Sequence, residues 1–255
     1  MAFLDRRDAG CRLADELEPL ARERPVIVAL PRGGVPVAVE VARALGSPLD
    51  VLAVRKLAVP GNPELGVGAL AEEGTRVLDE RSAGMLGVTQ ASLEAMITVH
   101  SQELRCMVAR YRGGRPSMPV GGRTVMIVDD GLVTGLSALA AVRVLRRRGA
   151  GRIVVAVPVG SGRSVSALAN DADRVVCLEV PPRLFGVGTW YRDFTPVSDE
   201  QVEALLADPG RDQASRNVEA DVVRTLYGDP AHRRLAYATA GHDPSGKPRD
   251  SSSEV

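Results

Sequence analysis

The sequence predicts an α/β protein in which a central parallel sheet is flanked by helices. Two observations indicate this class. Short, continuously apolar runs alternate with stretches of helical periodicity, which is the pattern of strands that are buried on both faces. Glycine or polar residues directly follow several of these runs, as expected where ligands bind beyond the carboxyl ends of parallel strands.

The expected elements alternate along the first 207 residues. Several of the expected helices are followed by proline or glycine, which end helices. The expected strands are residues 26–30, 49–54, 124–128, 153–157 and 174–178. The expected helices are residues 8–22, 35–45, 89–111, 136–148 and 165–169.

Three segments depart from this alternation. Residues 57–75 are rich in glycine and proline and predict a loop with short extended pieces. Residues 178–196 concentrate the aromatic side chains of a chain that is only 3% aromatic, and we expect them to form a small C-terminal hood. Residues 208–255 are polar and predict a weakly ordered tail. We therefore expect one domain over residues 1–207, followed by the tail.

Composition narrows the class of partner. The 32 basic and 32 acidic residues balance, so global charge gives no reason to expect a nucleic-acid or membrane partner. The three cysteines are far apart and the three histidines lack metal-ligand spacing, which argues against a disulfide framework and a zinc site. The charged N-terminus does not resemble a signal peptide, and we expect a cytoplasmic protein.

An acidic pair, Asp129 and Asp130, directly follows the apolar run at 124–128. Adjacent carboxylates repel each other, so a stabilising role is unexpected, whereas two acceptors match the two hydroxyl donors of a sugar diol. The turn that follows, Gly131–Gly135, leads into a helix with Thr134 and Ser137 near its start. Backbone N–H groups, hydroxyls and a helix N-terminus suit a monophosphate. Together the two features predict binding of a ribose 5-phosphate.

Other interpretations exist for parts of this pattern. A strand that ends in Asp-Asp also occurs in phosphorelay receiver domains, where the pair follows the first strand rather than lying in mid-chain. A threonine or serine near a helix start is often only an N-cap. The chain has neither a Walker lysine nor a GxGxxG segment here, which disfavours P-loop and dinucleotide-binding proteins.

The thirteen-residue segment Val125–Ser137 resembles the phosphoribosyl diphosphate (PRPP) signature of type I phosphoribosyltransferases. The resemblance implies the type I phosphoribosyltransferase fold, with the acidic pair on the ribose hydroxyls. It also implies that the turn wraps the 5-phosphate. The implied turn residues are Gly131, Val133, Thr134, Gly135, Leu136 and Ser137.

Leu30–Gly34 follows the first strand, where this family places its pyrophosphate loop. Gly33 and Gly34 allow close backbone approach to a phosphate, and Arg32 supplies a cationic fork. Family members often hold a non-proline cis peptide here. By position we expect it at the Pro31–Arg32 or the Arg32–Gly33 bond.

Arg55 and Lys56 follow the second expected strand, as a similar Arg-Lys pair does in orotate and adenine phosphoribosyltransferases. The resemblance implies that Arg55 and Lys56 bind PRPP and that residues 57–75 form a mobile loop that closes over the substrate. Lys56 is the only lysine before the tail, and Lys247 lies within the tail. A lone Arg-Lys is otherwise a common solvated pair.

The aromatic segment resembles the purine-binding hood of hypoxanthine-guanine phosphoribosyltransferases. The resemblance implies that Phe185, Val187, Trp190 and Tyr191 contact the base, and that Asp193 is a second magnesium ligand. The alternative is that these aromatic residues fill a small core or a dimer interface. A homodimer is compatible with either interpretation.

The acceptor stays open. Val133 stands where 6-oxopurine enzymes carry an aspartate in the turn, and residues 153–174 contain no lysine to read an exocyclic oxygen. The sequence more closely resembles stand-alone bacterial phosphoribosyltransferases without an assigned acceptor. We expect transfer of a phosphoribosyl group from PRPP to a nitrogenous acceptor, with Mg²⁺ held mainly by substrate oxygens. The catalytic residues would be Arg32, Lys56, Asp129 and Asp130. The alternative function is a PRPP-sensing regulator without catalysis.

Overall fold

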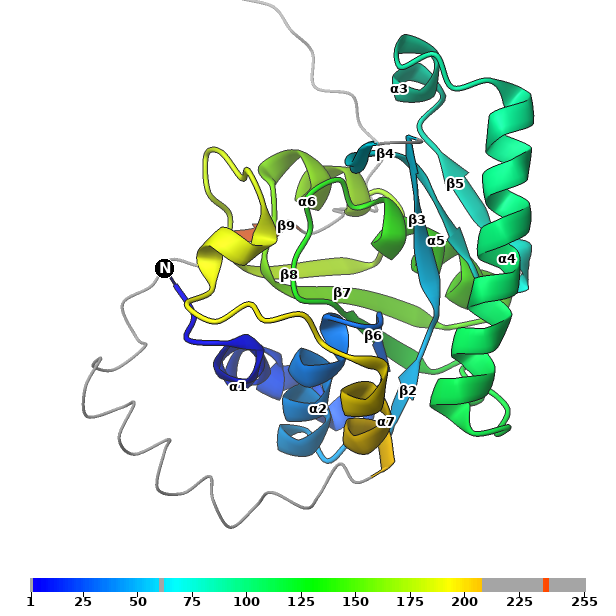
Figure 1. Cartoon of the computed structure of the whole chain (residues 1–255). Helices are drawn as coiled ribbons and strands as arrows, with labels where there is room; N and C mark the ends of the chain where they lie inside the picture. The colour runs from blue at the N-terminus through cyan, green and yellow to red at the C-terminus, as the bar shows by residue number, and fades with distance from the viewer. Residues whose placement is uncertain (1, 60–61, 208–235, 239–255) are drawn as a thin grey trace, which may run out of the picture.

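The computed structural model describes residues 2–59, 62–207 and 236–238, and its centre is a six-stranded sheet (Figure 1). The strand order is β2-β1-β6-β7-β8-β9, and all neighbouring strands are parallel except the β8–β9 pair. The expected α/β class and its parallel sheet are therefore confirmed. The strands are β1 Val26–Ala29, β2 Leu49–Val51, β6 Thr124–Val128, β7 Arg152–Val159, β8 Arg174–Glu179 and β9 Ala236–Ala238.

Helices cover both faces of the sheet because side chains alternate along each strand. In β6, Met126 and Val128 pack on the face covered by α1 (Arg6–Leu17), α2 (Gly34–Ala44) and α7 (Asp199–Ala207). Val125 and Ile127 pack on the opposite face, below α5 (Leu136–Arg147) and α6 (Gly162–Leu168). Burying one such side chain stabilises the folded state by roughly 1.5–3 kcal/mol. This gain favours a fold in which helices cover both faces of the sheet.

A second, antiparallel sheet corrects two expectations. The expected strand 49–54 is divided into β2 and the start of β3 (Val54–Val59), and the expected loop 57–75 is largely the hairpin of β3 with β4 (Asn62–Ala71). The sheet continues through η2 (Glu72–Gly74) to β5 (Arg76–Leu78). It lies between α5 and α4 (Gln90–Arg112), as Figure 1 shows, with the short helix α3 (Glu80–Met85) beyond β5.

Glycines inside β4 explain why the sequence suggested a loop. A Cβ at Gly66 would lie 2.5 Å from Cε of Lys56, and one at Gly68 would lie 2.6 Å from the carbonyl oxygen of Val77. These glycines therefore permit close cross-strand approach inside a strand instead of marking a turn. Whether the hairpin moves as a lid stays a prediction.

The remaining parts follow the expected order. A short 3-10 helix, η1 (Glu18–Glu23), ends the first helical segment, and η3 (Val187–Trp190) lies within the expected hood. Of the expected tail, only β9 belongs to the described residues, and it pairs with β8. The rest of residues 208–255 lies outside them. Across the described part of the chain, no helix combines the length and the apolar character needed to cross a membrane.

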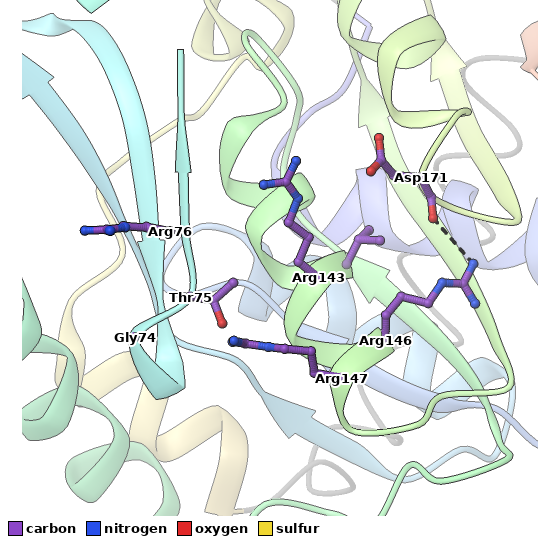
Figure 2. A pocket seen from close by; sticks show the side chains of 8 residues that line it. Gly74, Thr75, Arg76, Arg143, Arg146, Arg147 and Asp171 are labelled. Atoms are coloured by element: carbon purple, nitrogen blue, oxygen red, sulfur yellow. Dashed lines mark hydrogen bonds between the residues drawn. The ribbon is translucent and has the colours of Figure 1, made fainter. Parts of the chain in front are cut away.

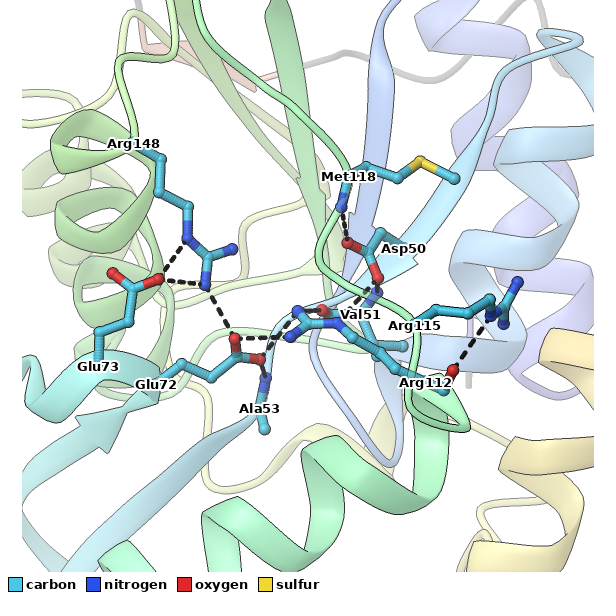
Figure 3. A network of polar contacts seen from close by, with 9 residues as sticks. All are labelled: Asp50, Val51, Ala53, Glu72, Glu73, Arg112, Arg115, Met118 and Arg148. Carbon is cyan, nitrogen blue, oxygen red and sulfur yellow. Dashed lines mark hydrogen bonds and ion pairs between the residues drawn. The ribbon is translucent and has the colours of Figure 1, made fainter.

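A buried ion network joins the hairpin to the main sheet (Figure 3). Glu72 in η2 accepts hydrogen bonds from Arg112 at 2.9 and 3.1 Å and from Arg148 at 2.9 Å. It also accepts the backbone N–H of Ala53 at 2.8 Å. Arg112 in turn donates to the carbonyl oxygen of Val51 in β2 at 2.6 Å. The Glu72 carboxylate thus links η2, the ends of α4 and α5, and the edge of the main sheet.

We predict that Glu72→Ala lowers the free energy of unfolding by about 3 kcal/mol, because it leaves the guanidinium of Arg112 buried without its main counter-charge. Urea denaturation measures this loss. The control is Glu73→Ala, which removes a half-exposed carboxylate that pairs with the same Arg148 and should cost less than about 1 kcal/mol. Equal losses in the two variants would contradict the role assigned to burial.

Candidate active site

The acidic pair lies at the carboxyl end of β6, in the centre of the sheet. The side chain of Asp130 is only 15% exposed, and Oδ1 of Asp129 accepts the backbone N–H of Asp130 at 2.9 Å. Burial, together with repulsion from Asp130, raises the pKa of Asp129 well above its usual value. Burial also raises the pKa of Asp130, although Arg6 opposes that rise. The pair is thus costly to keep ionised without a positively charged or hydroxyl-bearing ligand.

Arg6 is a site residue that the sequence analysis missed. Its Nε lies 2.8 Å from Oδ2 of Asp130, its Nη1 donates to the carbonyl oxygen of Thr195 at 2.9 Å, and its guanidinium lies 3.8 Å from the ring centre of Phe194. These contacts join the first helix, the acidic pair and the hood. No local pattern marks one arginine among many for a partner 124 residues away. Only the fold reveals this contact.

The glycine loop after β1 meets the acidic pair directly. A Cβ at Gly33 would lie 2.0 Å from Oδ2 of Asp130, and one at Gly34 would lie 2.7 Å from the carbonyl oxygen of Val128. Any larger residue would displace the carboxylate or the strand end. The Pro31–Arg32 peptide is cis, which confirms one of the two expected positions. The structure therefore brings the expected pyrophosphate loop and the expected ribose-binding carboxylates together.

Arg32 belongs to the same loop but faces a different partner. Its side chain is 44% exposed, and its Nε lies 3.6 Å from Oδ1 of Asp199 at the start of α7. Asp199 also pairs with Arg110 at 3.1 Å and accepts a hydrogen bond from the hydroxyl of Tyr111. In this arrangement Arg32 contacts α7 and, within the described residues, forms no ion pair with Asp129 or Asp130. Its role toward pyrophosphate stays a prediction.

The expected phosphate turn is fixed by hydrogen bonds to neighbouring residues, while several of its own backbone N–H groups stay open. The backbone N–H of Leu132 donates to Val159 at 2.9 Å, and the hydroxyls of Ser161 and Ser164 donate to the carbonyl oxygen of Val133 at 2.9 and 2.6 Å. Gly135 adopts a φ of +75° as α5 begins. Within the described structure, the backbone N–H groups of residues 133–137 have no recorded acceptor. Open donors at and just before a helix N-terminus suit an anion, and phosphate binding by this turn stays a prediction.

Arg55 and Lys56 do not follow the second strand of the main sheet, as expected, but lie within β3, on opposite faces of the hairpin. Arg55 pairs with Leu70, whose side chain packs toward α4, and its Nε lies 3.1 Å from Glu103 of that helix. Lys56 pairs with Ala69, whose side chain packs toward α5. The structure therefore places Lys56 on the hairpin face that packs toward α5, and Arg55 on the other face.

The expected base-binding residues have different surroundings. Tyr191 is buried, with its ring centre 5.3 Å from that of Phe3 and 5.0 Å from that of Phe194. Its hydroxyl donates to the carbonyl oxygen of Asp130 at 2.7 Å. The expectation that Tyr191 offers a stacking surface is thus wrong, because the ring fills a small aromatic core. Phe185, by contrast, is 86% exposed.

The other expected hood residues lie nearer the turn. Val187 packs beside Gly131, where an added Cβ would lie 2.7 Å from both of its methyl groups. Trp190 is half-buried beside the same aromatic core. Asp193 is exposed, and hydrogen bonds from Thr195 lower its pKa. Among the described residues there is no cluster of three or more His, Cys, Asp or Glu side chains that could hold a metal. Asp193 as a magnesium ligand stays a prediction.

The structure is an α/β protein whose acidic pair, glycine loop and open turn meet at the carboxyl ends of its parallel strands. The model of the phosphoribosyl transferase domain family matches residues 12–192. The chain belongs to this family, and the expected type I phosphoribosyltransferase fold is confirmed.

Known relatives agree with this assignment. A provisionally named phosphoribosyl transferase of Mycobacterium tuberculosis H37Rv is 43% identical over 242 residues, which are 95% of this chain and 54% of the relative. The protein of the same description in strain CDC 1551 matches equally. The chain thus spans about half the length of these curated relatives. The crystal structure of TT1426 from Thermus thermophilus is similar with a TM-score of 0.67 and 47% identity, covering 82% of this chain and 99% of that one.

We predict that Asp129→Asn stabilises the unliganded protein by about 1 kcal/mol at neutral pH. The folded state raises the pKa of Asp129 above its value in the unfolded chain. Above the raised pKa the ionised carboxylate therefore destabilises the folded state, and this cost disappears as the pH falls and the carboxylate is protonated. The advantage of the variant should therefore shrink on acidification. Urea denaturation at neutral and mildly acidic pH measures both effects.

Asp79→Asn is the control for this prediction. Hydrogen bonds from Ser82 lower the pKa of Asp79, so the sign is reversed and this variant should lose stability at neutral pH. A loss of stability in Asp129→Asn as well would contradict the proposed cost of the ionised acidic pair.

Proposed function

We propose that the protein binds PRPP and transfers its 5-phosphoribosyl group to a nitrogenous acceptor, releasing pyrophosphate. The observation that carries this proposal is the direct contact between the glycine loop and the acidic pair, where a Cβ at Gly33 would lie 2.0 Å from Oδ2 of Asp130. A ligand at that junction meets carboxylate acceptors and backbone at the same point. A ribose that bears a diphosphate at C1 has this combination of groups.

The phosphate turn supports the other end of the ligand. Asp130 and the turn are consecutive in the chain, so hydroxyls on the carboxylates place the 5-phosphate beside the N–H groups of residues 133–137. The hydroxyls of Thr134 and Ser137 stand at the start of α5, where the helix dipole favours an anion. The ribose 5-phosphate would thus span Asp129 to Ser137.

Two cationic side chains are suited to the leaving pyrophosphate. Lys56 lies on the hairpin face that turns toward α5, and Arg32 lies in the loop beside Gly33. Arg32 would exchange its exposed ion pair with Asp199 for the pyrophosphate, which costs little because exposed pairs contribute at most about 1 kcal/mol. Arg55 is not proposed as a pyrophosphate ligand, since it faces Glu103 of α4.

A divalent cation such as Mg²⁺ fits this donor set. Asp129 and Asp130 are adjacent, largely buried carboxylates with raised pKa values, and a cation bridged through ligand oxygens would relieve their repulsion. Asp193 at the hood is the further candidate ligand. When bound, the ion would neutralise the charge that develops on the leaving pyrophosphate.

The chemistry follows from positioning. The bond between C1 and the diphosphate oxygen breaks, and pyrophosphate leaves with the bonding electron pair. A bond from C1 to the acceptor nitrogen forms, and the proton of that nitrogen passes to solvent. Positive charge that develops on the ribose ring lies near the carboxylates, which stabilise it. Val133 occupies the turn position of the acid/base in 6-oxopurine enzymes, so this chain would rely on orientation and electrostatics.

We propose a nucleobase as the acceptor class. Phe185 is 86% exposed in the hood and offers a free aromatic face, while Val187 and Trp190 form the adjoining apolar edge. Val133, at 45% exposure, adds an apolar contact on the side of the turn. PRPP and nucleobases are cytoplasmic metabolites, and we propose that the protein acts in that compartment.

A PRPP sensor without catalysis is the second candidate. The ion pair of Arg32 with Asp199 favours it, because that pair ties the pyrophosphate loop to α7 and would break when ligand binds. Both candidates bind PRPP, and only the enzyme releases pyrophosphate.

Calorimetric titration of PRPP with Mg²⁺ tests the shared part of the proposal. We predict binding to the wild-type protein and a loss of at least about tenfold in affinity for Asp130→Asn and Gly33→Ala, since each disturbs the junction of loop and carboxylate. Gly84→Ala is the control, because a Cβ there meets nothing within 4 Å. An absence of PRPP binding at millimolar concentration would overturn the proposed function.

Pyrophosphate release across a panel of nucleobases separates enzyme from sensor. On the base that is turned over, we predict that Lys56→Met lowers kcat/KM by at least about tenfold, while the neighbouring Arg55→Met lowers it less than about threefold. The two variants remove the same charge from opposite faces of one hairpin. Equal losses would contradict the assignment of Lys56 to the site, and PRPP binding without turnover of any base would favour the sensor.

A further inference from the structure

An arginine-rich hollow lies apart from the acidic pair, between α5 and the edge formed by η2 and β5 (Figure 2). It encloses about 510 Å³. Arg143, Arg146 and Arg147 line it from α5, Thr75 and Arg76 line the opposite wall, and Asp171 is its acidic lining residue. None of these residues has a part in the proposed transfer reaction.

Few acidic side chains offset the positive charge of these arginines. Arg146 turns to the carbonyl oxygen of Asp171 and pairs with Asp173 at 2.6 Å. Within the described part of the chain, Arg76, Arg143 and Arg147 form no ion pair or hydrogen bond through their side chains. Residues 143, 146 and 147 are neighbours on one helix face, where like charges destabilise the helix. A bound anion would relieve this repulsion.

The helix dipole accounts for only part of this cluster. Cations in the last turn of a helix are favourable, which covers Arg146 and Arg147. Arg143 lies a turn earlier, and Arg76 belongs to β5 on the opposite wall. Two separate elements therefore bring arginines to one hollow.

The two walls are fixed to each other. Arg148, which follows α5, pairs with Glu72 at 2.9 Å and with Glu73 at 2.7 Å, and both acidic residues precede the wall that carries Thr75. Thr75 is itself buried, and its hydroxyl donates to the carbonyl oxygen of Glu72 at 3.2 Å. These contacts link the two walls, and exposed guanidinium groups line the hollow between them.

We infer that this hollow is a second anion site, which binds a small molecule that carries linked phosphates. Its volume lies in the range of about 300–1,000 Å³ that is usual for small-molecule sites. Arg147 reaches toward Thr75 in Figure 2, and Arg143 stands one turn away. Guanidinium groups placed apart in this way suit a ligand with more than one phosphate. A nucleic acid would need a basic stripe that continues beyond the hollow, but Asp171 and Asp173 border it.

Calorimetric titration with tripolyphosphate tests the site. All proteins carry Gly33→Ala, which weakens the proposed PRPP site, so that substitutions of the arginines report binding at the hollow. We expect Arg143→Gln/Arg147→Gln to weaken tripolyphosphate binding at least about tenfold. The control, Arg22→Gln/Arg105→Gln, removes the same charge from two exposed arginines elsewhere and should change binding less than about twofold.

Further titrations with other ligands identify the kind of molecule that carries the phosphates, and some of their outcomes would refute the site. Tighter binding of ATP or GTP than of tripolyphosphate would support the site and identify a nucleotide ligand, whereas equal affinities would support inorganic polyphosphate. Equal weakening in the control, or no binding at millimolar tripolyphosphate, would overturn the inference. Binding of a single-stranded RNA that depends on Arg143 and Arg147, without binding of tripolyphosphate, would also overturn the inference. Because the measurement needs no PRPP, its failure is separate from failure of the proposed function.

Discussion

The position of the hairpin over the main sheet depends on one buried carboxylate, that of Glu72. A buried charge is costly unless it is fully paired, and Glu72 receives donors from Arg112, from Arg148 and from the backbone of Ala53. These donors come from the ends of α4 and α5 and from the connection between β2 and β3. The contact therefore fixes three layers at once. Because the hairpin carries Lys56, these buried interactions also determine where Lys56 lies relative to the rest of the proposed site.

Helix α5 connects the proposed phosphate turn with the proposed second anion site. The open N–H groups of residues 133–137 lead into its first turn, and its last two turns carry Arg143, Arg146 and Arg147 of the hollow. The acidic pair lies just before this helix and is kept at a cost, since burial raises both carboxyl pKa values. We expect the ionised pair to lower stability here, as is usual where a site must be ready for a charged ligand.

The sequence predicted those features that are local in the chain. Strand, acidic pair and turn are consecutive in Val125–Ser137, and the cis peptide lies in the loop before Gly33, so pattern and position were sufficient. It failed where partners are distant. Arg6 meets Asp130 only through the fold, and the burial of Tyr191 depends on Phe3 from the other end of the chain. The glycines of β4 were misread because close cross-strand contact and a flexible turn favour the same residue.

The aromatic core of the hood has an optical consequence. Trp190 is the only tryptophan in the chain, and its carbonyl oxygen accepts the backbone N–H groups of Ala2 and Phe3. The next residue, Tyr191, donates its hydroxyl to the carbonyl oxygen of Asp130. A single indole is therefore fixed one residue from a side chain that contacts the acidic pair. Its emission comes from one known position, so the protein carries an intrinsic fluorophore at the edge of its site and needs no attached label.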